Sequence, residues 1–335
     1  FHLYSLDLAL RQIGSHHRHF DAGKHLGRGH KDLQQRFLRY MDETLRSAMQ
    51  ALALALTFDH ALFRLLIKED LIKGIPVQGF HDLVGSGNGH VLPTGTGYRF
   101  HGKMQEALLA HLHDQPTGPQ QAADVIASLV AHYSAQLAEA VSRQDTAAMQ
   151  AAFTRAADIL LAHAETGLLD VAVFGPAFFA LDEALPHGLL ARPRLATWTH
   201  AEGVFRARLS ADAKEILDAR GAIAHWTGDS GDARTALALS AALLPDLQRV
   251  LGPDHPGTLT TRLNVAHWSG EAGDARTALA LFKALLPDLL RILGPDHPST
   301  LVTRNNIAAR TGETGDVRAA LALFKALLPD RLRVL

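Results

Sequence analysis

Polar side chains recur at matching positions in three segments of the chain, and they suit the recognition of another protein. An asparagine amide donates and accepts hydrogen bonds at once, so it can pair with the backbone of an extended peptide. An arginine can hold a carboxylate through two parallel hydrogen bonds. The alternative is that these groups only solvate their surface or bond between neighbouring segments. The candidate peptide-binding residues are His225, Arg262, Asn264, His267, Arg304, Asn305 and Asn306.

No catalytic set accompanies these residues. The chain lacks the G-x-x-x-x-G-K-[ST] loop that cradles phosphates, the H-E-x-x-H helix of zinc proteases and the G-x-S-x-G nucleophile turn. The glycine-rich stretch at 85–90 lacks the Lys-Ser/Thr pair that reaches phosphate and magnesium in such a loop, so it predicts a loop before a hairpin. The histidine-rich stretch at 14–20 has no helical partner at i+4 and predicts a solvated loop rather than a metal site. We therefore expect no enzyme activity, metal or cofactor in this chain.

Composition narrows the class further. Hydrophobic residues make up 47% of the 335 residues but aromatic residues only 6%, which favours an aliphatic, alanine-rich helical core. The net charge of −1 gives no general attraction to nucleic acid or anionic membrane. Absent cysteines and the lack of a long apolar run predict a cytoplasmic protein without a membrane segment. Since the chain opens on Phe1 rather than methionine, we expect a fragment of a longer protein.

A period of 42 residues organises the second half of the chain. The phrase LGPDHP occurs at 251–256 and 293–298, and GDARTALAL occurs at 231–239 and 273–281, with a third version from Gly315. Such a period is typical of stacked repeats. Each repeat predicts two helices, here 258–269 and 274–293, with a glycine turn between them and Asp274 as the cap of the second.

Recurring apolar positions predict how the repeats pack. Leu279, Phe282, Leu285 and Leu286 follow helical spacing and should fill the layer between repeats. Tryptophan recurs at 226 and 268, where the next copy has arginine, and this position predicts packing rather than recognition.

These residues resemble the tetratricopeptide repeat, in the long form of kinesin light chains and many actinobacterial regulators. The match is carried by Ala266, Gly273, Ala278 and Phe282 with the LGPDHP linker; by Ala308, Gly315, Ala320 and Phe324; and, less fully, by Ala224, Gly231, Ala236 and Ser240. The resemblance implies an α-α superhelix whose first helices line a concave groove for a protein or peptide ligand. Because asparagines of this helix contact peptides in the kinesin repeats, it makes Asn264 and Asn306 the leading candidates.

Residues 41–114 predict three helices, a β-hairpin around 90–100 and a closing helix, the order of a winged-helix domain. One winged-helix role is DNA binding, but the third helix, at 77–84, carries no lysine or arginine for phosphates, which argues against DNA. The other role belongs to signalling ATPases of the STAND and NB-ARC type. Their hairpin ends in a Met-His-Asp motif, which Phe100-His101-Gly102 resembles in part. That resemblance implies that His101 contacts the β-phosphate of ADP; the alternative is a helix-capping histidine.

Together these features predict a mainly α protein, with a winged-helix domain followed by an α-α superhelix of tetratricopeptide repeats. We expect a helical segment at 1–40, the winged helix at 41–114, irregular helical hairpins at 120–209 and the repeats at 210–335. The leading functional prediction is the regulatory sensor part of a bacterial STAND-type ATPase, whose full-length form would bind ATP or ADP and oligomerise on activation. The alternatives are a DNA-binding regulator and a non-catalytic docking scaffold.

Overall fold

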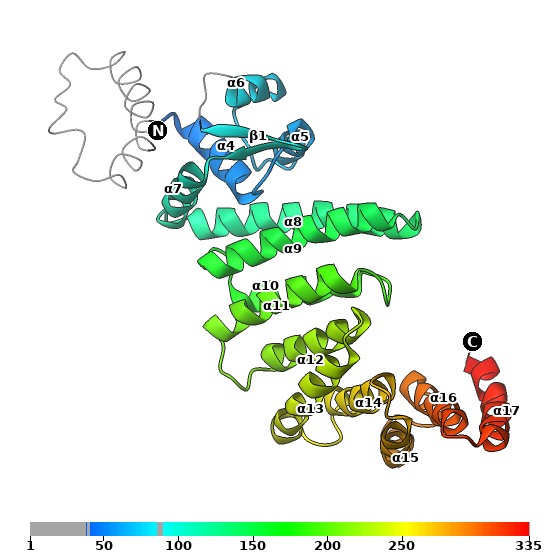
Figure 1. Ribbon diagram of the computed structural model, residues 1–335. Helices are drawn as coiled ribbons and strands as arrows, with labels where there is room; N and C mark the ends of the chain where they lie inside the picture. The colour runs from blue at the N-terminus through cyan, green and yellow to red at the C-terminus, as the bar shows by residue number, and fades with distance from the viewer. Residues whose placement is uncertain (1–37, 39–40, 86–89, 335) are drawn as a thin grey trace, which may run out of the picture. The chain divides into compact units, whose positions relative to one another are not determined.

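The computed structural model describes residues 38, 41–85 and 90–334 (Figure 1). The helical segment expected at 1–40, with its histidine-rich stretch at 14–20, therefore lies outside the described residues, apart from Leu38. The chain divides into two compact units, the first ending at Ala184 and the second beginning at Leu185. Each unit is described by itself below.

The first unit begins with the helices and hairpin that the sequence predicts over 41–114, in the same order. Asp42 and Asp59 cap the first two helices by accepting the backbone amides of Leu45 and Leu62. The two strands pair antiparallel, with Val91 opposite Phe100. The elements are α4 (Glu43–Leu54), α5 (His60–Lys68), η1 (Val77–Gly79), α6 (Phe80–Val84), β1 (Val91–Thr94), β2 (Gly97–Phe100) and α7 (Gly102–His113).

Aromatic side chains hold this part together. Phe58 exchanges two backbone hydrogen bonds with Tyr98, and its ring lies 5.1 Å from that of Phe100. The buried rings of Phe63 and Phe80 lie 5.4 Å apart. The hairpin is thus fastened to the chain that enters α5. The predicted elements are confirmed, while membership of the winged-helix family stays a prediction.

A long helical hairpin follows, made of α8 (Gly118–Ser142) and α9 (Thr146–Thr166), which pack side by side (Figure 1). Asp145 caps α9 through the amide of Ala148, at the junction that the sequence predicts. The apolar stretch at 167–175 favours a turn in the sequence, but α10 (Val171–Glu183) already begins in its second half, capped by Asp170. Pro176 lies inside α10 as its sixth residue, beyond the first turn in which proline is normally tolerated.

Buried His163 connects α9 to the end of α4. Its Nε2 lies 2.7 Å from the carbonyl oxygen of Leu54, one of the last carbonyls of α4, which lack helical partners. Nε2 therefore donates, and the unprotonated Nδ1 lies buried without a hydrogen-bond partner among the described residues. Burial lowers the pKa of His163, and the hydrogen bond to Leu54 opposes that shift only in part. The packing thus requires a neutral imidazole.

Acid should destabilise the first unit through this histidine. Because the pKa of His163 is lower in the folded state, the unfolded state binds the proton more readily. The stability that neutral His163 contributes to the folded state is fully present above the unfolded pKa of about 6.5. It is lost as the pH falls below that value towards the folded pKa. We expect the urea midpoint of the protein to fall between pH 7.5 and pH 5. His163→Gln, which can still donate to Leu54, should show a smaller fall, and an unchanged pH dependence in this variant would contradict the assignment.

The second unit is a series of helices of regular length. The sequence favours two short helices at 193–203 and 204–209, but the structure forms one helix over this region, α11. The helices are α11 (Ala191–Arg208), α12 (Lys214–Asp229), α13 (Ala233–Val250), α14 (Pro256–Glu271), α15 (Ala275–Ile292), α16 (Pro298–Glu313) and α17 (Val317–Val334).

Consecutive helices of this unit pack as pairs, and each pair also packs on the next (Figure 1). Ala266, Ala278 and Phe282 are fully buried in one cluster with Ile307 of the following pair. A second cluster joins Leu259 to Leu285 and Leu289. The fold is therefore mainly helical and is an α-α superhelix of the tetratricopeptide type, as predicted. Within the described residues, no helix is long and apolar enough to cross a membrane.

Candidate protein-binding face

The three repeats superimpose in sequence on one set of helix boundaries. The first helices begin at Lys214, Pro256 and Pro298, and the second helices begin at Ala233, Ala275 and Val317. Both ends of α11 lie one 42-residue period before those of α13, although the sequence of α11 lacks the phrases that mark the later repeats. Trp198 of α11 is buried at the position that Phe282 occupies two periods later. Trp198 is therefore the feature of the sequence from which α11 could have been predicted as the second helix of an earlier repeat.

Three residues of the linker phrase have a local structural role. Gly252 and Gly294 have positive φ angles of 91° and 86°, which end the second helices. His255 and His297 cap the next first helices, their Nδ1 atoms accepting backbone amides two residues on at 3.1 Å. The prolines that follow occupy the first helical turn, where no amide hydrogen is needed. The linker histidines are thus committed to the fold rather than to a ligand.

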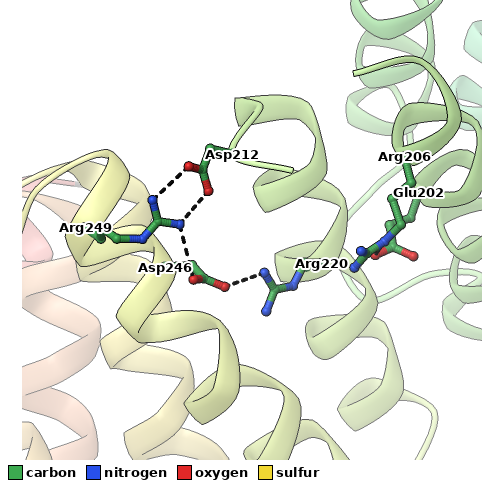
Figure 2. Close-up of polar contacts among 6 residues, drawn as sticks. All are labelled: Glu202, Arg206, Asp212, Arg220, Asp246 and Arg249. Atoms are coloured by element: carbon green, nitrogen blue, oxygen red, sulfur yellow. Dashed lines mark hydrogen bonds and ion pairs between the residues drawn. The ribbon is translucent and has the colours of Figure 1, made fainter. Parts of the chain in front are cut away.

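Four charged side chains of alternating sign form a network in each of the three repeats, and Figure 2 shows the network of the first repeat. In the first repeat Arg220 donates to Asp246 at 2.7 Å. Arg249 lies between Asp246 and Asp212 and donates to Asp212 from both terminal nitrogens. The set recurs one and two periods later with the same pairing. Its members are Asp212, Arg220, Asp246 and Arg249; Asp254, Arg262, Asp288 and Arg291; and Asp296, Arg304, Asp330 and Arg333.

These networks contain residues that sequence reasoning passed over. The sequence analysis assigns no role to the aspartates and arginines of the second helices. The aspartates recur 26 residues after each first-helix arginine, and this spacing could have indicated the pairs. Arg249 lowers the pKa of the Asp212 carboxyl, and Arg291 lowers that of Asp254, through direct hydrogen bonds. These carboxylates therefore stay ionised, and the guanidinium groups stay paired.

Large side chains of one repeat cover a glycine of the preceding repeat. A methyl group on Gly228 would lie 2.4 Å from the ring of Trp268, and one on Gly270 would lie 2.6 Å from the guanidinium of Arg310. Arg310 pairs with Glu271 and Glu313, while the guanidinium of Arg194 lies 3.8 Å above the ring of Trp226. The recurrent tryptophans are buried, so their packing role is confirmed.

The first helices lie on the inner side of the array. α12 contacts α14, and α14 contacts α16, in addition to their own partners. Among the described helices, no pair of neighbouring second helices packs as closely. Stacked pairs arranged in this way curve so that the first helices line the concave side.

One stripe of each first helix remains open to solvent. In α14 it follows the helical spacing of Thr260, Asn264, His267 and Glu271, which are exposed or partly exposed. The first-helix stripe, as we name this surface, comprises Asp218, Ala222, His225 and Asp229; Thr260, Asn264, His267 and Glu271; and Val302, Asn306, Ala309 and Glu313.

Four of the predicted residues lie on the first-helix stripe: Asn264, Asn306, His225 and His267. The asparagines are partly exposed, and neither side chain forms a hydrogen bond to any residue that the structure describes. Each histidine ring lies 4.5 Å from that of the adjacent tryptophan. Burial lowers the pKa of both histidines, against the opposing effects of Asp229 and Glu271. At neutral pH the stripe thus offers uncharged amides and imidazoles beside the carboxylates that it also carries.

The other three predicted residues lie elsewhere on their helices. Arg262 and Arg304 belong to the charge networks, with Asp288 and Asp330 as their partners at 2.8 Å. Asn305 stands one period after Leu263, which packs against the core clusters. The geometry therefore separates these three from Asn264 and Asn306.

In the first unit, His101 lies at the start of α7. Its Nδ1 accepts the amide of Lys103 at 3.4 Å, and its own amide donates to the carbonyl of His90 at 2.8 Å. The side chain therefore caps the helix, which was the alternative reading of this position. Its proposed contact with a nucleotide stays a prediction. Among the described residues, no group of histidine and acidic side chains is arranged to hold a metal ion.

Comparisons with known proteins address the repeats. Residues 258–299 match the tetratricopeptide repeat family model, one full period. No curated protein sequence matches the chain. A putative kinesin light chain from Podosopora anserina, with nearly identical TPR-like repeats, is 16% identical with a TM-score of 0.37, over 67% of this chain and 92% of its own. BtubC from P. vanneervenii is 15% identical with a TM-score of 0.41, over 67% of this chain and 87% of its own.

A third solved structure is longer than this chain. It is a signal transduction ATPase with numerous domains (STAND), with a tetratricopeptide repeat sensor, from Pyrococcus horikoshii. It is 12% identical with a TM-score of 0.34, and the match spans 92% of this chain but 53% of that one. These scores are too low to carry an argument about function. The family match and the paired helices together show that this chain carries tetratricopeptide repeats.

Proposed function

We propose that the repeats bind an extended protein segment along the first-helix stripe, and that they serve as the sensor of a STAND-type signalling protein. The observation that carries the binding proposal is the pair Asn264 and Asn306. They occupy the same position in successive repeats, are partly exposed and have no side-chain hydrogen bonds within the described part of the chain. Their charged neighbours Arg262 and Arg304, in contrast, are already paired.

The spacing of the asparagines suits an extended backbone. Packed helices lie roughly 8–10 Å apart, and an extended chain rises about 3.3 Å per residue. Amides on neighbouring first helices can therefore pair with peptide groups about three residues apart. Each amide offers two donors and an acceptor, so it recognises backbone rather than a particular side chain. Selectivity would come from His225 and His267 beside the asparagines.

A peptide selection tests this proposal. Peptides selected from a random library on the wild-type protein should bind Asn264→Ala/Asn306→Ala roughly 10- to 100-fold more weakly, since each lost hydrogen bond is worth about 1 kcal/mol. Arg276→Ala, an exposed second-helix change, is the matched control and should bind as wild type. Fluorescence anisotropy gives the affinities, and circular dichroism checks helicity. Equal affinity of the double variant and the control would contradict the proposal.

The sensor role rests on domain order. Helices, a hairpin and α7 with His101 at its start precede the repeats, which is the order expected downstream of a nucleotide-binding core. Ligand binding that favours one arrangement of such a protein would shift its population towards the active form. α6 and η1 carry no lysine or arginine, so DNA binding gains no support from them.

The encoded sequence upstream of Phe1 tests the sensor role most directly. A P-loop core is expected there, and its absence would leave a docking scaffold as the function. A protein that includes such a core should release ADP faster when the selected peptide is added. His101→Ala should also accelerate release without peptide, whereas unchanged release would reduce His101 to a capping residue.

A further inference from the structure

A cleft in the first unit lies between the α8–α9 hairpin and the entrance to α5. Its volume is about 530 Å³, within the usual range for small-molecule sites. Buried Leu62 and alanines of α8 and α9 form its apolar wall, and polar side chains stand around them. A small chamber adjoins it, lined by Thr57, Thr96, Tyr133 and Arg155 among others.

Arg155 is the unusual member of this lining. It is partly buried, and its guanidinium donates one hydrogen bond, to the hydroxyl of Thr96 at 3.1 Å. It forms no ion pair with any carboxylate that the structure describes. Charged groups withdrawn from water are normally paired, because desolvation is costly. An unpaired guanidinium that faces a cleft therefore favours an anionic ligand.

The acidic groups of the cleft are engaged elsewhere. Asp59 accepts the amide of Leu62, Asp145 accepts the amide of Ala148, and Glu139 pairs with Arg143. None of them neutralises Arg155. The rim arginine, Arg143, differs from Arg155 because it already has its carboxylate.

Two hydroxyl groups stand beside the guanidinium without partners. The side-chain oxygen of Thr57 is buried in the wall of the chamber and has no hydrogen bond within the described structure. The phenol of Tyr133 is partly buried and forms none to the described residues either. Burial raises the pKa of Tyr133, so the phenol stays protonated and can donate.

We propose that this cleft binds a small carboxylate-bearing molecule, whose carboxylate pairs with Arg155 and accepts from Tyr133 while its apolar body lies on the alanine wall. A guanidinium and a carboxylate match in geometry, with two parallel hydrogen bonds. The alanines at 140, 148, 151 and 152 leave room for a flat body, which a bulkier side chain would fill. This site lies in the first unit and does not depend on peptide binding by the repeats.

Isothermal titration with benzoate, a flat carboxylate, tests the proposal on the whole chain. Benzoate should bind the wild type with a millimolar or lower Kd, and Arg155→Gln, which keeps a donor for Thr96, should weaken binding at least tenfold. Tyr133→Phe should weaken it severalfold. Arg143→Gln is the matched control and should bind as wild type.

Inorganic phosphate and benzyl alcohol serve as comparison probes. Benzyl alcohol should not compete with benzoate, because it has the apolar body without the charge. Phosphate that binds more tightly than benzoate in an Arg155-dependent way would overturn the carboxylate assignment. Absence of benzoate binding to the wild type, or equal binding to Arg155→Gln with an unchanged melting temperature, would overturn the site itself.

Discussion

Phe282→Ala is expected to lower the free energy of unfolding of the repeats by about 3–5 kcal/mol, the usual cost of emptying a fully buried phenylalanine site. Phe282 is completely buried between Ala266, Ala278 and Ile307. The same residue one period later, Phe324, is 40% exposed. Phe324→Ala removes the same atoms from a partly solvated site and should cost only about 1 kcal/mol.

Chemical denaturation of the two variants measures this difference. Since repeats unfold as neighbouring units rather than strictly together, the signal should be followed through the tryptophans Trp226 and Trp268 and through circular dichroism in parallel. The sequence context is the same at both positions, FKALLPD, so intrinsic helix propensity cannot explain a difference. Equal destabilisation by the two changes would show that the layer between repeats is not the main source of stability.

Gly228→Ala should destabilise the repeats by about 1–3 kcal/mol, although alanine is normally the better helix former. The added methyl would lie 2.4 Å from Trp268, a rigid ring held by the next repeat. The two first helices, α12 and α14, would have to move apart. Gly203→Ala is the matched control, because nothing lies within 4 Å of its methyl, and it should stabilise α11 by about 0.5–1 kcal/mol.

Gly270 provides a graded comparison. Its methyl would meet the guanidinium of Arg310, the end of a flexible side chain that can move aside. Gly270→Ala should therefore cost less than Gly228→Ala, measured by thermal unfolding under the same conditions. A larger cost at Gly270 would mean that the ion pairs of Arg310 with Glu271 and Glu313 matter more than the packing of Trp268.

The sequence predicts the repeat architecture well because its information is local and repeated. Phrases spaced by 42 residues fix the helix pairs, and the caps at Asp274 and the turn at Gly273 appear as expected. Between 167 and 209 such phrases are missing, and prolines at 176 and 193 suggested breaks. Pro193 lies in the first turn of α11, where proline is tolerated, whereas Pro176 lies inside α10; both helices begin before their prolines.

The candidate site was predicted only in part. Residue type and period point to the polar groups of the first helices, but they cannot tell which of these groups already have a partner in the fold. Arg262 and Asn264 are two positions apart and therefore face different directions on a helix. The former meets Asp288 of the second helix, and the latter meets solvent. The Arg155 cleft carries no sequence signal, because it joins residues from α5, the hairpin and both helices of α8–α9.

The alternating charge networks have an evolutionary consequence. All four members of each network come from one period of 42 residues, and their charges sum to zero. Duplication or loss of a whole period would therefore leave every remaining network complete, with each of its four ions paired. The length of the array can change by recombination between nearly identical gene segments at little electrostatic cost, which makes the number of repeats an easily varied trait.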